Sequence, residues 1–350
     1  MNKPDIEGLV RPNIRKLCPY STARDEYAGK IGTFLDANES PYPSGWNRYP
    51  DPRQKELKEK IASIRGVRPE NIFLGNGSDE AIDLIFRVFC VPGTDNVVAI
   101  APSYGMYSVC ADINDIEVRQ VLLNEDFSLP VERLLAACDS NTKAMFLCSP
   151  NNPSGNAFPK ELLLEIISRF NGMVVVDEAY ADFSREPGLM GEIGNHPNLV
   201  ILQTFSKARG MAALRLGMAF SNDYVIALMS MVKYPYNVNE STQKLALKAL
   251  EAPIDAQVAE IVSERGALSA SLERFSCVRK VYPSEANFIL VKVDDADAMY
   301  KFLLDRQIIV RNRTGMPLCG NCLRITVGLP EENVRLLKAI EEYEESDICR

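Results

Sequence analysis

The chain has 350 residues, of which 46% are hydrophobic and 25% charged, with a formal net charge of −8, as is typical of a globular protein of about two domains with a large core. This negative charge argues against a general nucleic-acid binder, which needs a basic face. No apolar run reaches the roughly 18–20 residues of a membrane span and no apolar leader opens the chain, so a cytoplasmic protein is the default expectation.

The first part of the chain predicts an arm, a loop and a helix. Residues 1–30 are mixed and polar without a clear period, which favours an arm over a domain. Residues 33–50 are rich in Pro, Asn, Ser and Gly and predict a turn-rich loop. Residues 52–65 place their apolar side chains on one helical face.

The next segment predicts a strand, a small-residue turn and a helix. An apolar strand at residues 71–75 leads into Gly77, Ser78 and Asp79, and apolar residues recur at helical spacing over 81–90. The free amides and positive end of such a helix suit an anion. Acidic residues are also ordinary in a first helical turn, so this segment alone leaves phosphate binding open.

Further apolar strands with helices between them continue the pattern. They are predicted at residues 97–100, 142–148, 173–176 and 199–202, and a helix is predicted at 160–170. Strands separated by helices pair in parallel, so their carboxyl ends meet at one edge, where open α/β sheets bind ligands. The polar residues after these strands are Tyr104, Asn152, Asp177, Tyr180, Thr204, Ser206 and Lys207. Nucleotide-binding glycine fingerprints are absent, which disfavours dinucleotides and ATP.

Lys207 follows a buried strand, which is an unusual place for a solvating charge. Ser206 lies beside it, and Arg215 follows eight residues later. Arginine and hydroxyl groups are suited to hold a phosphate, and the lysine amine could act as a nucleophile on the molecule that carries it. A surface lysine and arginine on a loop fit this stretch equally well.

After about residue 236 the pattern changes to a small α+β unit. Helices are predicted at 241–251, 254–274, 296–306 and 331–344, and strands at 278–282, 287–293, 308–310 and 322–327. We therefore expect an N-terminal arm (1–30), a large domain (31–240) and a small C-terminal domain (241–350).

Nine cysteines and one histidine restrict the possible chemistry. Most cysteines lie singly in apolar runs, which is typical of buried thiols rather than a disulfide framework. Cys319 and Cys322 form a lone C-x-x-C pair, and His196 lies in a turn-like segment. Neither a metal site nor a serine–histidine triad is predicted.

The ordered set of strand-end residues resembles the fold-type-I aminotransferases that use pyridoxal 5′-phosphate. It comprises Tyr104, the Asn152-Pro-Ser-Gly turn, Asp177-x-x-Tyr180 and Ser-Lys207 with Arg215. The resemblance covers about residues 15–340 and is strongest to the branch that acts on histidinol phosphate. It implies an α/β fold with a mostly parallel central sheet flanked by helices, plus a smaller α+β domain.

The resemblance also implies a role for each residue. Lys207 would form a Schiff base with the cofactor and then move a proton; Asp177 would face the pyridine nitrogen; Tyr104 would stack on the ring. Tyr180 and Asn152 would bind the ring oxygen. The cofactor phosphate would lie on Gly77, Ser78, Asp79, Thr204, Ser206 and Arg215, with Tyr49 reaching it from the other subunit of a homodimer.

Alternation over residues 323–327 places Arg324 on the opposite face from Leu323 and Ile325. In the family an arginine so placed binds the substrate carboxylate. The resemblance therefore implies a substrate site of Tyr20, Asn38, Arg311 and Arg324, which would bind the phosphate of histidinol phosphate and the carboxylate of glutamate. Surface arginines paired with nearby acids remain the alternative.

The expected activity is ping-pong amino transfer from L-histidinol phosphate to 2-oxoglutarate, in histidine biosynthesis. An aromatic amino acid aminotransferase, a threonine-phosphate decarboxylase and a non-catalytic protein on the same scaffold stay open as alternatives. The chain departs from the family pattern at Ser154, where threonine is commoner, and at Arg209, for which the sequence indicates no role.

Overall fold

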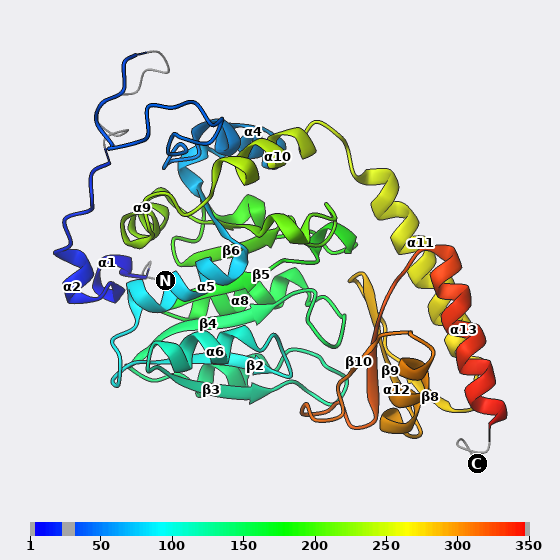
Figure 1. Cartoon of the computed structure of the whole chain (residues 1–350). Helices are drawn as coiled ribbons and strands as arrows, with labels where there is room; N and C mark the ends of the chain where they lie inside the picture. Colours follow the sequence, from blue (N-terminus) through cyan, green and yellow to red (C-terminus); the bar gives the residue numbers. More distant parts are fainter. Residues whose placement is uncertain (1–3, 23–31, 347–350) are drawn as a thin grey trace.

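The computed structural model describes residues 4–22 and 32–346. Its larger sheet has seven strands in the order β1-β7-β6-β5-β4-β2-β3 (Figure 1). The strands are β1 (Ile72–Asn76), β2 (Asn96–Ala101), β3 (Glu117–Leu122), β4 (Thr142–Cys148), β5 (Met173–Asp177), β6 (Leu199–Thr204) and β7 (Leu216–Phe220). Every strand runs in the same direction except β7, which is antiparallel to both β1 and β6. The start of β7 therefore lies at the same edge as the carboxyl ends of the other strands.

Helices surround this sheet and bury its apolar strands. They are α1 (Ile6–Leu9), α2 (Pro12–Arg15), α4 (Lys55–Arg65), α5 (Ser78–Phe89), α6 (Met106–Ile113), α7 (Val131–Ala136), α8 (Lys160–Arg169), α9 (Asp223–Val232) and α10 (Glu240–Ala249). The burial of β4 and β5 on both faces explains their near-continuous apolar sequences. Helix α5 packs on β1 and β7, so its N-terminus is fixed at the edge where the strands end.

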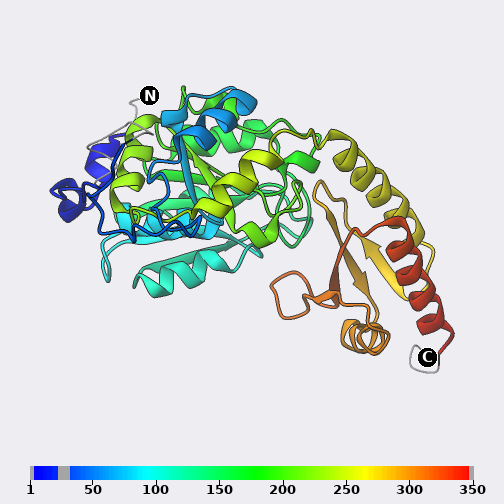
Figure 2. The ribbon, with the colours of Figure 1, turned by 45° about the horizontal axis from the view of Figure 1, so that its top comes forward.

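The smaller sheet is antiparallel, with the order β10-β11-β9-β8, and lies to one side of the larger one (Figures 1 and 2). Its strands are β8 (Val278–Val281), β9 (Phe288–Val293), β10 (Arg311–Asn312) and β11 (Cys322–Thr326). The helices with it are α11 (Asp255–Leu272), α12 (Ala296–Asp305) and α13 (Pro330–Glu345). Apolar residues of β9 and β11 form a second core with these helices.

The mostly parallel sheet with a smaller antiparallel one is the predicted fold class. One predicted element is wrong: residues 308–310 are not a strand, and β10 begins at Arg311 instead. The apolar Ile308 and Val310 suggested a strand, but the chain pairs with β11 only through the polar residues that follow. Strands β3 and β7 were missed, because β3 is amphipathic and exposed in part, and β7 contains Gly217.

The division into arm, large and small domains stays a prediction. The arm lies partly outside the described residues, and α1 and α2 within it bury Ile6, Val10 and Ile14. Helix α10, most of which the predicted division assigns to the small domain, packs on α4 of the predicted large domain. None of the helices in the described segments has both the length and the apolar character that crossing a membrane requires.

Candidate active site

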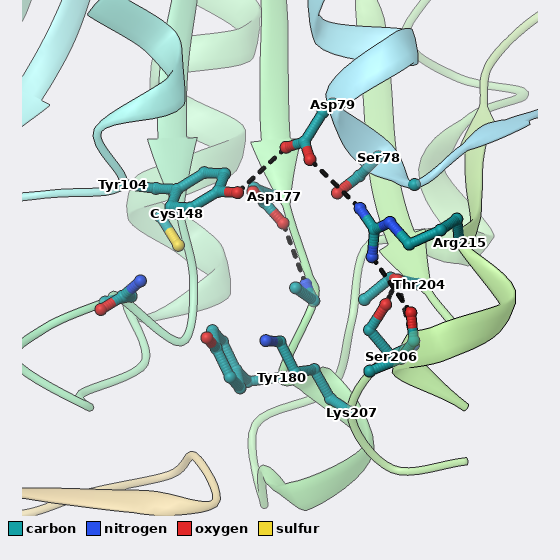
Figure 3. Close-up of a pocket in the computed structure, with 14 residues that line it drawn as sticks. Ser78, Asp79, Tyr104, Cys148, Asp177, Tyr180, Thr204, Ser206, Lys207 and Arg215 are labelled. Atoms are coloured by element: carbon teal, nitrogen blue, oxygen red, sulfur yellow. Dashed lines mark hydrogen bonds and ion pairs between the residues drawn. The ribbon is translucent and has the colours of Figure 1, made fainter. Parts of the chain in front are cut away.

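A pocket lies at the edge where the strands of the larger sheet end (Figure 3). Its cavity volume is about 150 Å³. Its walls are Gly77, Ser78, Asp79, Tyr104, Cys148, Asn152, Asp177, Ala179, Tyr180, Thr204, Ser206, Lys207, Ala212 and Arg215. The structure thus brings together predicted residues from five strand ends and from the segment before β7.

Two glycines allow β1 and β7 to meet at one wall of the pocket. Gly77 has φ +74°, a left-handed conformation that favours glycine, and a Cβ there would lie 2.7 Å from Nη2 of Arg215. A Cβ on Gly217 would lie 2.1 Å from the backbone of Gly77. The amide of Gly77 donates to the carbonyl of Arg215 at 2.6 Å. Glycine at both positions therefore places the guanidinium over the N-terminus of α5.

Asp79 links two sides of the pocket. Its carboxylate accepts a hydrogen bond from the hydroxyl of Tyr104 at 3.0 Å and lies 3.5 Å from Nη2 of Arg215. Burial, followed by the charge of Asp79, raises the pKa of Tyr104. These contacts hold the aromatic ring and the guanidinium in fixed positions.

Asp177 is buried at the floor of the pocket. The hydroxyl of Tyr107 donates to Oδ2 of Asp177 at 2.9 Å, and the amide of Ala179 donates to Oδ1 at 3.1 Å. Burial raises the pKa of Asp177 to about 6, although both hydrogen bonds act in the opposite direction. A nearby cation would favour the ionised form of this carboxyl.

Lys207 and Tyr180 lie side by side in the pocket, with Nζ of Lys207 5.4 Å from the ring centroid (Figure 3). Burial, and then the charge of Arg324, lowers the pKa of Lys207, which increases the neutral share of its amine. Ahead of this lysine, the hydroxyl of Thr204 hydrogen-bonds that of Ser206 at 3.0 Å. This turn presents hydroxyl groups and an amine to the same space.

Arg209 has a structural role that the sequence did not indicate. Its Nη1 donates to the carbonyl of Ala249 at the end of α10, at 3.3 Å. Its guanidinium carbon lies 5.7 Å from the ring centroid of Phe205. A cation at a helix C-terminus is stabilising, so Arg209 ties the loop of Lys207 to α10.

The smaller sheet reaches the pocket through Arg324. Its Nη1 donates a short hydrogen bond to Oδ1 of Asn152, and its guanidinium carbon lies 5.2 Å from the ring centroid of Phe288. Its Nε is buried without a hydrogen-bond partner. Arg311 on β10 is the register partner of Arg324 on β11, but it is exposed.

Three predicted residues lie away from this pocket. Tyr49 stacks on Tyr236, with 4.4 Å between ring centroids, and lines a separate surface pocket that also includes Asn38. Tyr20 is 75% exposed. These residues contribute nothing to the pocket within one chain.

Two residues beside the pocket were missed as site residues. Tyr107 lies in the first turn of α6, three residues after Tyr104, and this spacing was the available signal. Cys148 ends β4 and lines the pocket, but its sequence context indicates only a buried strand. Cys319 and Cys322 are buried, and burial raises their pKa values to about 12 and about 11, so both thiols stay protonated.

The donor set fits pyridoxal 5′-phosphate. Hydroxyls, a helix N-terminus and Arg215 form one wall, suited to a phosphate. The buried carboxylate of Asp177 suits a protonated ring nitrogen. Lys207 lines the same pocket, and its amine suits the aldehyde of such a cofactor.

The chain is similar to known proteins over most of its length. Residues 36–340 match the family described as aminotransferase class I and II. The chain is 53% identical over 342 residues to a histidinol-phosphate aminotransferase of Bacteroides fragilis, which covers 97% of this chain and 99% of the relative.

Solved structures share the fold. A histidinol-phosphate aminotransferase of Sinorhizobium meliloti in complex with pyridoxal-5′-phosphate has a TM-score of 0.78 and 24% identity, covering 96% of this chain and 97% of that one. The L-threonine-O-3-phosphate decarboxylase of Porphyromonas gingivalis has a TM-score of 0.71 and 26% identity, covering 85% and 91%.

Proposed function

The chain belongs to the class I and II aminotransferase family, and from this premise we propose that it transfers the amino group of L-histidinol phosphate to 2-oxoglutarate. The products are imidazole-acetol phosphate and L-glutamate, and the step belongs to histidine biosynthesis. The carrying observation is Arg324, which is bonded to Asn152 at the Lys207 pocket and keeps an unpartnered Nε for an anionic substrate.

When bound, pyridoxal 5′-phosphate supplies an aldehyde that condenses with amines and a ring that takes up the electron pair left when Cα loses its proton. Lys207 would supply the amine that condenses with this aldehyde. Its lowered pKa makes Nζ a base for the Cα proton of the amine donor. Asp177, oriented by Tyr107 and Ala179, keeps a proton on the ring nitrogen.

The other pocket residues bind and orient. Gly77, Ser78, Asp79, Thr204, Ser206 and Arg215 surround the place for the cofactor phosphate. Tyr104, fixed by Asp79, would cover one face of the ring, and Tyr180 and Asn152 would hold the ring oxygen by hydrogen bonds. Preorganised polar groups of this kind need little rearrangement during the reaction.

Arg311 and Arg324 bind the substrate anion, and the pairing of β10 with β11 holds them as neighbours. The phosphate of histidinol phosphate and the carboxylate of glutamate occupy the same place in the two half-reactions. Tyr20 and Asn38 lie away from the pocket within one chain, so they would complete the substrate site across the interface of a homodimer.

The proposal includes a homodimer with shared sites, in which Tyr49 would reach the cofactor phosphate of the partner. Large apolar side chains are exposed in this part of the chain, as expected of an interface. They are Leu17, Tyr20, Leu35, Tyr42, Trp46 and Tyr49. A cytoplasmic location is part of the same proposal and agrees with the free thiols of the described cysteines.

A steady-state comparison tests the substrate. With 2-oxoglutarate as acceptor, kcat/KM should be highest for L-histidinol phosphate. A higher value for phenylalanine would indicate an aromatic aminotransferase. Release of carbon dioxide from threonine phosphate, without formation of glutamate, would indicate a decarboxylase like the structurally similar one of Porphyromonas gingivalis.

A further inference from the structure

Alternation divides the smaller sheet into two faces. Ile289 and Leu323 belong to the core formed with α11, α12 and α13. On the other face, Leu290 pairs with Arg324, and both Leu290 and Cys322 belong to the hydrophobic cluster of the larger sheet. The face that carries Arg324 is therefore turned toward the larger sheet and its pocket.

Arg313 lies on this same face. Arg311 is the register partner of Arg324, and the amide of Arg313 continues the ladder by donating to a carbonyl of β11 at 2.8 Å. Side chains two residues apart on a strand share a face. Asn312, between the two arginines, points the other way and donates to Asp297 at 2.6 Å.

Within the part of the chain that the structure describes, these arginines have no anionic partner. The Nε atoms of Arg313 and Arg324 are both buried without a hydrogen-bond partner. Among residues 4–22 and 32–346, no carboxylate forms an ion pair with Arg311, Arg313 or Arg324. Buried donors and clustered cations of this kind are costly unless an anion satisfies them.

The charge of Arg313 acts on the pocket. Burial raises the pKa of Tyr180, and the positive charges of Arg324 and Arg313 oppose this rise. Burial, and next the charge of Arg324, lowers the pKa of Arg313 itself. Arg313 and Arg324 thus belong to one electrostatic group beside Tyr180.

We propose that Arg313 is a third anion-binding side chain of the substrate site, which makes the site prefer a phosphate monoester dianion to a carboxylate. This inference rests on the proposed function and deepens it. A phosphate monoester carries a charge of about −1.5 to −2 at pH 7 and three acceptor oxygens. A carboxylate has less charge and two oxygens, so an added arginine favours the phosphate.

The test measures kcat/KM of Arg313→Gln with each of two amine donors, histidinol phosphate and glutamate. Loss of one charge-assisted hydrogen bond should lower kcat/KM for histidinol phosphate about 10- to 100-fold, chiefly through KM. The value for glutamate should fall less than about threefold. The ratio between the two donors should also shrink in the wild type below about pH 6, where the phosphate monoester gains a proton.

Arg279→Gln is the matched control, because Arg279 lies on β8 of the same sheet and pairs with Asp294. It should leave both donors unchanged, and Arg313→Lys should recover part of the phosphate preference. Equal losses for both donors in Arg313→Gln, or no loss for either, would overturn the proposal.

A binding measurement keeps this inference separate from the proposed function. Calorimetric titration of the holoenzyme with inorganic phosphate should show weaker binding in Arg313→Gln than in the wild type. If the wild type converts no histidinol phosphate, the proposed function fails, and the titration still decides on Arg313. Equal phosphate affinities in the two proteins would refute the role of Arg313.

Discussion

Two regions of the molecule differ in how far their polar and charged side chains are paired. One is the edge of the larger sheet where its strands end, and the other is the arginine face of the smaller sheet, which carries Arg311, Arg313 and Arg324. At the edge, polar side chains satisfy one another: Tyr104 bonds Asp79, and Tyr107 bonds Asp177. On the arginine face, Arg313 and Arg324 keep buried donors without partners. The first arrangement suits one resident ligand, whereas under the proposed function the second would be completed by each substrate in turn.

This difference agrees with the two tasks of an aminotransferase. A cofactor that stays bound needs a site of fixed geometry, and interlinked hydrogen bonds supply it. Under the proposed function two different substrates occupy one place in succession, so their anionic groups require donors that remain without a protein partner, such as Nε of Arg324.

Replacing Lys207 should have the largest effect, because it removes the only amine that lines the pocket in the described residues. Lys207→Ala should lower kcat by about 10³-fold or more through loss of both the nucleophile and the base. Steady-state assays with saturating cofactor measure this. A loss of kcat below about tenfold would show that another group carries out the chemistry. The larger sheet's strand-end edge would then not be the catalytic region.

Burial of Asp177 should lower the free energy of unfolding of the cofactor-free protein. A rise in pKa from the usual 3.8 to about 6 corresponds to about 3 kcal/mol. Since the folded state raises this pKa, the destabilisation is absent below about pH 4, grows between pH 4 and 6, and is complete above pH 6.

Asp177→Asn should therefore make the cofactor-free protein more stable by about 3 kcal/mol at pH 8, and equally stable at pH 4. The asparagine oxygen can still accept from Tyr107. Chemical denaturation at both pH values measures the difference. A variant less stable than the wild type at pH 8 would show that Asp177 is not strained by burial.

Replacing Arg324 should weaken the use of both substrates without weakening cofactor binding. Arg324→Gln removes a charged donor used by both substrates, so kcat/KM should fall about 10- to 100-fold for histidinol phosphate and for 2-oxoglutarate. Cofactor affinity, measured by titration of the cofactor-free protein, should change little. A loss confined to one substrate would contradict shared use of this arginine.

Arg209 should give the smallest effect. Arg209→Ala removes the contact between the Lys207 loop and the carbonyl of Ala249, which should cost about 1 kcal/mol of stability. Activity at low temperature should stay within about threefold of the wild type. Thermal unfolding of the holoenzyme measures the change, and a large loss of kcat without a loss of stability would give Arg209 a direct role.

The sequence predicts the parallel part of the fold well because its strands are long apolar runs. Strand β4 has the predicted bounds, Thr142–Cys148, since an apolar run ends at a proline-rich turn there. The short edge strand β10 could not be placed, because its two residues are polar and are defined as a strand only by their pairing with β11. The antiparallel β7 was likewise invisible, although its position puts Arg215 at the pocket.

The candidate site could be predicted where a residue lies at the end of a strand or a few residues after it. Asp177 and Lys207 are of this kind, because the end of a parallel strand fixes the edge at which they lie. For Tyr107 the only signal was its spacing from Tyr104, because its contact with Asp177 is a tertiary hydrogen bond. Arg313 gave no signal, since its place beside Arg324 depends on the pairing of β10 with β11. Tyr20, Asn38 and Tyr49 stay predictions that depend on a second subunit.

The most direct test of the Lys207-centred site is borohydride reduction of the purified holoenzyme followed by peptide mapping. The purified holoenzyme should be yellow, and reduction should attach one cofactor per chain irreversibly to Lys207. Attachment to a different lysine, or no attachment at all, would contradict the role of Lys207.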